Sequence, residues 1–273
     1  MNRFPASPAL RRLSHIASTL SSSRLHKMAS PDSTIVLITG ANQGLGFEVA
    51  KKLATDHPGY HVLMGYRDAA KGEEAIAKLK GQGLTVDGVI IDVTDDTSIQ
   101  SAAKQVADQF GRLDVLINNA GVITEGRLPE GTSLRQTWQA SFDINTTGQV
   151  VTTEAFIPLL EKAAVPRIVF VSSALGSCTG RLDPKDQFAA FQFPAYRSSK
   201  AALNMIACHY ASLYGPKGWK VNASDPGFCA TNFNGFRGWG TPESGALQTV
   251  HLATLDKDGP NGTFSNTDGP LGW

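Results

Sequence analysis

Apolar runs typical of strands alternate with segments of helical periodicity along the chain from Thr34 onward. The short runs are rich in β-branched and aliphatic residues. The longer segments repeat their apolar positions every three or four residues, as Leu45, Val49 and Leu53 do. The pattern predicts strands at 34–39, 61–64, 86–91, 113–117, 168–171, 219–223 and 263–265. It predicts helices at 45–54, 69–79, 96–110, 137–160, 195–214 and 242–253.

This alternation is typical of a parallel sheet that helices cover on both faces. The predicted strands are almost continuously apolar, as expected of strands buried on both sides. No composition break or linker interrupts the chain after Thr34. We therefore predict the α/β fold class: a single doubly wound, Rossmann-type domain over residues 31–273, with a mostly parallel seven-stranded sheet.

Residues 1–30 differ in composition from the rest of the chain. They contain five Lys or Arg residues and many serines, but no acid. This composition fits a mitochondrial transit peptide, and it also fits a disordered extension or an unused start upstream of Met28. We expect one of the last two, and hence a cytoplasmic protein, with mitochondrial import as the alternative.

Charge and cysteine content exclude several classes of function. The net charge is +1, and no block of like charges offers a surface for nucleic acid. The longest apolar runs are too short to cross a bilayer, so we expect no membrane partner. Cys178, Cys208 and Cys229 lack metal-ligand spacing and are expected to be reduced thiols, and we predict no metal site.

The stretch ITGANQGLG, residues 38–46, places three glycines directly after the first predicted strand. At this position the N–H groups at the start of a helix favour an anion, and glycines let the backbone approach a diphosphate. The spacing matches neither the Walker loop nor G-x-G-x-x-G, and a tight turn without a ligand is the alternative. We predict a dinucleotide-binding turn formed by Gly40, Asn42, Gln43, Gly44, Leu45 and Gly46.

The end of the second predicted strand indicates which dinucleotide binds. NAD-binding domains tend to place there an acid that binds the ribose 2′-OH. Here Tyr66 takes the position of the acid, and Arg67 follows it. Because arginine can hold a 2′-phosphate through a charge-assisted fork, we predict that the cofactor is NADP(H). The alternative is a solvated Arg67 that pairs with Asp68.

Tyr196 and Lys200 stand four residues apart in YRSSK, on a predicted helix. This spacing puts them on one helix face, where an ammonium would lower the pKa of the phenol. A tyrosine tuned in this way can donate a proton to a carbonyl oxygen or take one from an alcohol. Ser173 ends a strand at the carboxyl edge of the predicted sheet, where its hydroxyl can bind the same oxygen. Each motif alone is common on protein surfaces, but together they favour a catalytic site.

As a set, these motifs resemble the short-chain dehydrogenase/reductase family, and the resemblance covers about residues 34–273. Two further stretches, GYRDAAKG and GRLDVLINNAG, look most like its NADPH-dependent carbonyl-reductase branch. The motifs that carry the resemblance are TGANQGLG at 39–46, NNAG at 118–121, Asn145 in DINTTG, Ser173, YRSSK at 196–200 and DPGFCAT at 225–231.

The resemblance implies a role for each of these residues. Tyr196 would be the acid–base, and Lys200 would lower its pKa and hold the nicotinamide ribose. Ser173 would orient the substrate oxygen, and Asn145 would support a water-mediated proton path to Lys200. The other cofactor contacts that it implies, from the adenosine to the carboxamide end, are Asp92, Val93, Asn119, Ala120, Gly121, Pro226, Gly227 and Thr231.

The reaction implied is the NADPH-dependent reduction of a ketone or aldehyde to an alcohol, on a small molecule of secondary or xenobiotic metabolism. Two alternatives stay open, an NAD-dependent alcohol dehydrogenase and a non-catalytic NADP(H) sensor. Sensors built on this fold tend to lose the tyrosine or the lysine, and this chain keeps both.

One segment departs from the family pattern. Ser173 and Tyr196 are 23 positions apart, and the extra residues include Phe188, Phe191 and Phe193. Loops beside catalytic residues often shape substrate pockets, so we predict a segment that contacts an apolar substrate. The alternative is an insertion that packs on the surface and limits dimer contacts. Monomer and homo-oligomer therefore both stay open.

Overall fold

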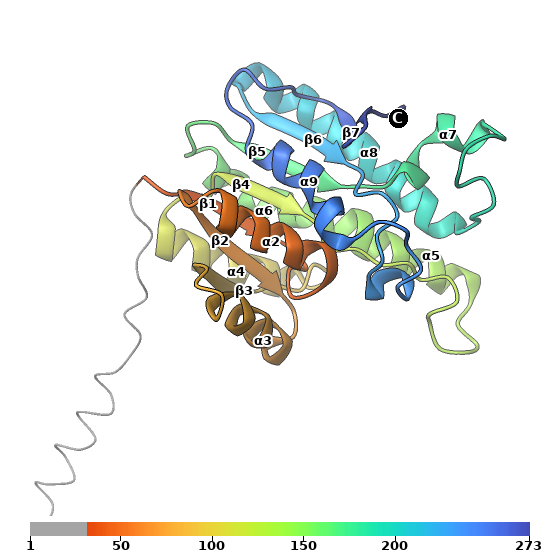
Figure 1. Ribbon diagram of the computed structural model, residues 1–273, viewed down its shortest axis with the longest axis horizontal. Helices are drawn as coiled ribbons and strands as arrows, with labels where there is room; N and C mark the ends of the chain where they lie inside the picture. Colours follow the sequence, from red (N-terminus) through yellow and green to blue (C-terminus); the bar gives the residue numbers. More distant parts are fainter. Residues whose placement is uncertain (1–31) are drawn as a thin grey trace, which may run out of the picture. The chain divides into compact units, whose positions relative to one another are not determined.

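A computed structural model describes residues 32–273 of the protein, and in that part of the chain an eight-stranded sheet forms the centre of the fold (Figure 1). The predicted leader, residues 1–30, lies outside the described residues. The strand order is β3-β2-β1-β4-β5-β6-β7-β8, and every neighbouring pair is parallel except β7 with β8. The strands are β1 (Thr34–Ile38), β2 (Tyr60–Tyr66), β3 (Val86–Ile90), β4 (Val115–Asn118), β5 (Arg167–Val171), β6 (Lys220–Ser224), β7 (Phe264–Asn266) and β8 (Gly269–Pro270).

Helices cover both faces of this sheet, as the doubly wound prediction requires (Figure 1). The α-helices are α2 (Gly44–Asp56), α3 (Ala69–Lys80), α4 (Asp96–Phe110), α5 (Leu134–Phe142), α6 (Gly148–Leu160), α7 (Cys178–Leu182), α8 (Pro194–Tyr214) and α9 (Pro242–Ala253). The short helical segments are η1 (Asp143–Thr147), η2 (Ala174–Gly176), η3 (Gly215–Lys217) and η4 (Asn232–Asn234).

The core divides into two layers, one on each face of the sheet. Helices α2, α3 and α9 share one continuous apolar cluster with the strands, in which Leu53, Leu79 and Val250 are buried. Helices α4, α6 and α8 lie on the opposite face (Figure 1), where α6 buries Phe156 completely. Strand β1 is buried from Ile35 to Ile38, which explains why its sequence is apolar without alternation.

The predicted α/β fold is confirmed, with two local differences. The structure adds β8, a two-residue strand that pairs antiparallel with β7. The predicted helix at 137–160 is divided into α5, the π-helical segment η1 and α6. Segments of π-helix widen one turn and often occur at functional sites. Over residues 32–273, no helix is both long and apolar enough to span a membrane.

The strand order also determines where a ligand can bind. Chain connections run from β1 outward through β2 to β3 on one side, and from β4 outward through β5 and β6 on the other. The loops that leave the carboxyl ends of β1 and β4 therefore diverge and open a crevice between them. Open α/β sheets bind their ligands at such a switch point.

Candidate active site

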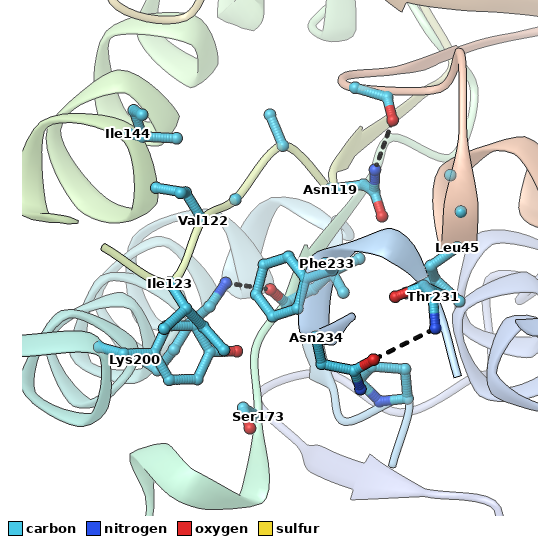
Figure 2. Close-up of a pocket in the computed structure, with 18 of the residues that line it drawn as sticks. Leu45, Asn119, Val122, Ile123, Ile144, Ser173, Lys200, Thr231, Phe233 and Asn234 are labelled. Carbon is cyan, nitrogen blue, oxygen red and sulfur yellow. Dashed lines mark hydrogen bonds between the residues drawn. The ribbon is translucent and has the colours of Figure 1, made fainter. Parts of the chain in front are cut away.

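A pocket of about 760 Å³ lies at the carboxyl ends of the strands. Its walls come from the turn after β1, the loops after β2 to β6, the segment 188–193 and the start of α8. In Figure 2, Lys200 and Ser173 lie at one end and Asn119 and Leu45 at the other, with Phe233 between them. Every residue that the sequence predicted for the site lines this pocket except Asn145, which is buried behind its wall.

The glycine-rich turn owes its glycines to two different constraints. Gly44 has φ +57°, a conformation that a residue with a side chain adopts at a cost, although space around it is ample. At Gly46 space is the constraint, because a Cβ would lie 2.5 Å from Asn119 Nδ2 and 2.6 Å from the Gly40 carbonyl oxygen. The Asn119 amide cannot move aside easily, since it donates to the carbonyls of Thr39 and Gly40. Glycine at position 46 therefore keeps the turn closely packed on β4.

The N-terminus of α2 faces the pocket without a side-chain cap. Its N-cap residue, Gln43, makes no capping hydrogen bond, and the first turn carries no acid. The Gln43 carbonyl Oε1 instead accepts a hydrogen bond from Asn232 Nδ2, which joins the turn to the loop after β6. The N–H groups at the start of a 13-residue helix, with their dipole, are suited to bind an anion such as a diphosphate.

Arg67 follows β2 and lines the pocket as an exposed residue. The alternative pairing with Asp68 does not occur, because Asp68 caps α3 by accepting the Lys71 N–H at 3.2 Å and lies 4.0 Å from Lys71 Nζ. No carboxylate in the described part of the chain pairs with Arg67. Tyr66 is buried against α3, where a Cβ on Gly72 would overlap its ring, so it does not reach the pocket. Of these two residues, Arg67 alone is available to a ligand.

The next wall of the pocket comes from the ends of β3 and β4, with Asp92, Val93, Asn119, Ala120 and Gly121. The Asp92 carboxylate accepts hydrogen bonds from the backbone and the hydroxyl of Thr94, which fixes the loop. A Cβ on Gly121 would lie 3.3 Å from Asn145 Oδ1, which is tight, and in ordinary contact with Lys200 Nζ at 3.5 Å.

Tyr196 and Lys200 lie on one face of α8, buried at the base of the pocket. Lys200 Nζ donates to the Val171 carbonyl at 2.8 Å and lies 5.8 Å from the centre of the Tyr196 ring. Ser173 lies beside the phenol, and its hydroxyl favours the charged form of Tyr196 and so opposes the rise in its pKa. Ser173 Oγ also accepts the Leu175 N–H at 3.2 Å, which orients the hydroxyl. The predicted trio is thus brought together by α8 and the turn that follows β5.

The protonation of this trio differs from the expectation that Lys200 lowers the pKa of Tyr196. Burial raises the pKa of Tyr196; the Ser173 hydroxyl offsets this in part, and the carboxylates of Asp225 and Glu125 raise it further. Burial also lowers the pKa of Lys200 to about 8. Among the groups of the protein itself, the cost of burying a charge outweighs the attraction between the Lys200 ammonium and the Tyr196 phenolate. Tyr196 is therefore a protonated phenol at neutral pH.

Asn145 lies in the π-helical segment η1 and is fully buried. Its Nδ2 donates to the Val122 carbonyl at 2.8 Å and to Ser199 Oγ at 3.0 Å, and its Oδ1 accepts the Val122 N–H at 2.8 Å. The Ser199 hydroxyl in turn donates to the Tyr196 carbonyl. The side chain thus fixes the loop after β4 to α8, and the water-mediated proton path to Lys200 stays a prediction.

The loop after β6 closes the pocket with Pro226, Gly227 and Thr231. Asp225, at the start of this loop, accepts the Ala174 N–H at 3.1 Å and also the Gly227 N–H. It thereby joins the loop to the turn that carries Ser173. Burial raises the pKa of Asp225.

Two carboxylates near Tyr196 were missed by the sequence analysis. Glu125 Oε1 accepts the backbone N–H of Tyr196 at 3.0 Å, at the start of α8, where the N-cap residue Phe193 makes no side-chain cap. Asp225 was quoted only as part of a motif. Neither has a local signal, because a single acid in a loop has no periodicity or spacing that distinguishes it.

One part of the pocket wall, which includes the surroundings of Tyr196, is aromatic. Phe188, Phe191 and Phe193 of the extra segment line it, as predicted, together with Phe228 and Phe233 from the loop after β6. The Phe233 ring meets the Tyr196 ring edge-on at 5.8 Å. Aromatic walls of this kind bind the apolar part of a ligand.

Comparisons with known proteins agree with the fold described above. The family model described as short chain dehydrogenase matches residues 34–238. A short-chain dehydrogenase of Penicillium roqueforti is 40% identical over 232 residues, which cover 83% of this chain and 91% of the relative. The structure of salutaridine reductase from Papaver somniferum superposes with a TM-score of 0.74 and 29% identity, over 85% of this chain and 99% of that one. The structure of NADPH-bound carbonyl reductase from chicken fatty liver superposes with a TM-score of 0.75 and 29% identity, over 88% of this chain and 99% of that one.

Proposed function

Because the chain belongs to the short-chain dehydrogenase/reductase family of oxidoreductases, we propose that it reduces a ketone or aldehyde to the alcohol with NADPH. The solved neighbour from chicken liver is a carbonyl reductase with NADPH bound, and the pocket described above has the parts that this reaction needs.

The residues at one end of the pocket fit a phosphorylated dinucleotide. The uncapped N-terminus of α2 suits its diphosphate, and Gly44 and Gly46 leave the backbone accessible. Arg67 has no carboxylate partner within residues 32–273 and suits a 2′-phosphate. Asp92, Val93, Asn119, Ala120 and Gly121 would line the adenosine side, and Pro226, Gly227 and Thr231 the carboxamide end. Bound NADPH would supply the hydride that reaches the carbonyl carbon.

The proton for the carbonyl oxygen comes from Tyr196. Its raised pKa keeps the phenol protonated until charge develops on the substrate oxygen. The Ser173 hydroxyl, oriented by the Leu175 N–H, donates a second hydrogen bond to that oxygen. Lys200 places a positive charge beside the phenol and stabilises the phenolate that the transfer leaves behind. Asn145 holds the loop after β4 against α8, so that these groups keep their spacing.

The observation that carries the proposal is that Ser173 and a buried Tyr196 phenol line one pocket with Lys200 and the glycine-rich turn. A non-catalytic sensor would not need this arrangement. An NAD-dependent alcohol dehydrogenase would share it, and Arg67 is what favours NADPH over NADH.

The direct experiment is to measure NADPH oxidation with a panel of aromatic ketones, quinones and aldehydes, and to repeat it with NADH. We expect carbonyl-dependent oxidation of NADPH and a much slower reaction with NADH. Tight binding of NADPH without turnover of any carbonyl would favour the sensor, and equal use of both cofactors would favour the NAD-dependent enzyme.

A further inference from the structure

The extra segment between Ser173 and Tyr196 ends in a stretch that we name the aromatic loop, residues 183–193. Phe188 stacks on Trp239 with ring centres 5.8 Å apart, and Phe191 meets Phe228 edge-on at 5.4 Å. These contacts join the aromatic loop to the loop after β6. Because Phe188, Phe191 and Phe193 also line the pocket, the position of this loop decides the shape of its apolar end.

The aromatic loop is joined to α8 in a strained conformation. Phe193, the N-cap residue of α8, has φ 36°, in the left-handed region that residues with a side chain seldom adopt. Such a conformation persists only when the surrounding structure holds it. Phe193 offers no side-chain cap to the helix, so the hold must come from elsewhere.

Glu125 binds the first turn of α8, and Arg197, the residue after Tyr196, holds the aromatic loop on the other side of Phe193. The Arg197 side chain is buried, and its guanidinium donates to three backbone carbonyls. Two of them belong to the aromatic loop, Phe191 at 3.0 Å from Nε and Phe188 at 2.7 Å from Nη2. The third is Leu175, 3.3 Å from Nη1, in the turn that begins with Ser173. One side chain therefore connects the catalytic helix, the serine turn and the aromatic loop.

Only an arginine side chain can direct a buried charge to these three carbonyls at once. No salt bridge to Arg197 forms within residues 32–273, and burial lowers its pKa. The charge is stabilised by carbonyl dipoles, and the planar fork directs its donors to three acceptors at once. Lysine has a single nitrogen and would reach fewer of these carbonyls. Methionine fills similar space and donates no hydrogen bond.

We propose that Arg197 is a positioning residue that determines specificity for large aromatic carbonyl substrates, because it fixes the aromatic loop on α8. The inference rests on the proposed carbonyl reduction. A large ring system would lie against Phe191 and Phe193 and needs the loop in place. A short aliphatic aldehyde would contact only the hydroxyls of Tyr196 and Ser173, so it does not need the loop in place.

The test compares acetonaphthone with butanal in wild type, Arg197→Met and Arg197→Lys. For Arg197→Met we expect KM for acetonaphthone to rise about tenfold, because the loop on which its rings pack is no longer held in place, with kcat little changed. The kcat/KM for butanal and the Kd for NADPH should stay close to wild type. Arg197→Lys should be intermediate for acetonaphthone. If Arg197→Met does not fold, the comparison of Arg197→Lys with wild type tests the proposal.

Arg181→Met is the matched control. Arg181 also donates to the aromatic loop, to the Ala189 carbonyl at 2.9 Å and to Gln192 Oε1 at 3.2 Å, but it is exposed, so water can replace it. We expect wild-type KM values for both substrates. An equal rise in KM for acetonaphthone and butanal in Arg197→Met, a loss of kcat alone, or no change at all would overturn the proposal.

A second readout does not depend on turnover. Lys185 is an exposed trypsin site in the aromatic loop. The full-length proteins are digested with trypsin in the presence of NADPH, and mass spectrometry measures the rate of cleavage after Lys185. We expect this cleavage to be faster in Arg197→Met than in wild type or Arg181→Met. If wild type binds NADPH but reduces no carbonyl, the proposed function fails, while this cleavage still tests whether Arg197 holds the loop. Equal cleavage in all three proteins would show that it does not.

Discussion

Replacing Arg67 by alanine removes an exposed guanidinium from the pocket wall at the end of β2. If NADPH binds as proposed, the variant loses charge-assisted hydrogen bonds to the 2′-phosphate. Such bonds contribute about 1.5–3 kcal/mol, and the low end applies because Arg67 is exposed and solvent screens the pair. A loss of about 1.5 kcal/mol corresponds to an approximately tenfold higher Kd for NADPH. NADH has no 2′-phosphate, so its Kd should not change.

The assay is a fluorescence titration of wild type and Arg67→Ala with NADPH and with NADH, at low and at physiological salt. Salt should weaken NADPH binding more in wild type than in the variant, because the pair that salt screens is absent from the variant. Lys71→Ala is the matched control: Lys71 is a nearby cation on α3 that does not line the pocket. A ratio of NADPH to NADH affinity that is the same in Arg67→Ala and wild type would refute the assignment of Arg67.

Two further predictions concern the base of the pocket and the turn. Burial lowers the pKa of Lys200 to about 8, so its ammonium is present below that pH and is lost above it. We expect kcat/KM for carbonyl reduction to fall above about pH 8, whereas a profile that stays level into the range of an ordinary lysine would contradict this role. Gly46→Ala should lower the free energy of unfolding by about 1–3 kcal/mol, because its Cβ would crowd the Gly40 carbonyl. Thermal unfolding measures the change. Gly59→Ala, where a Cβ meets nothing within 4 Å, should unfold like wild type.

The order of strands and helices was predictable because each strand of a covered parallel sheet is apolar along most of its length. The break at 143–147 was not predictable, because the segment 137–160 reads as one helix. In the structure, Asn145 in this segment donates hydrogen bonds to Val122 and Ser199. Both partners are distant in sequence, so the local pattern does not reveal these contacts. Strand β8 was missed because two residues, Gly269 and Pro270, are too few to form a pattern.

The candidate site was predictable where its residues share one element or one turn. Tyr196 and Lys200 stand on one helix, and the glycines of the first turn form a recognisable cluster. Glu125 was not predictable, since it meets the Tyr196 N–H across 71 positions of sequence. The predicted direction of the shift in the Tyr196 pKa was also wrong. Spacing reveals which charge is near, whereas burial depends on the packed loops around α8.

The central claim is that the Tyr196 hydroxyl delivers the proton in carbonyl reduction. Tyr196→Phe removes this hydroxyl and keeps the ring that packs against Phe233. The most direct measurement is the rate of NADPH oxidation by this variant with the best carbonyl substrate, together with its Kd for NADPH. The account predicts a rate about 10²–10⁴-fold below wild type, with binding of NADPH retained. A rate close to that of wild type would contradict it.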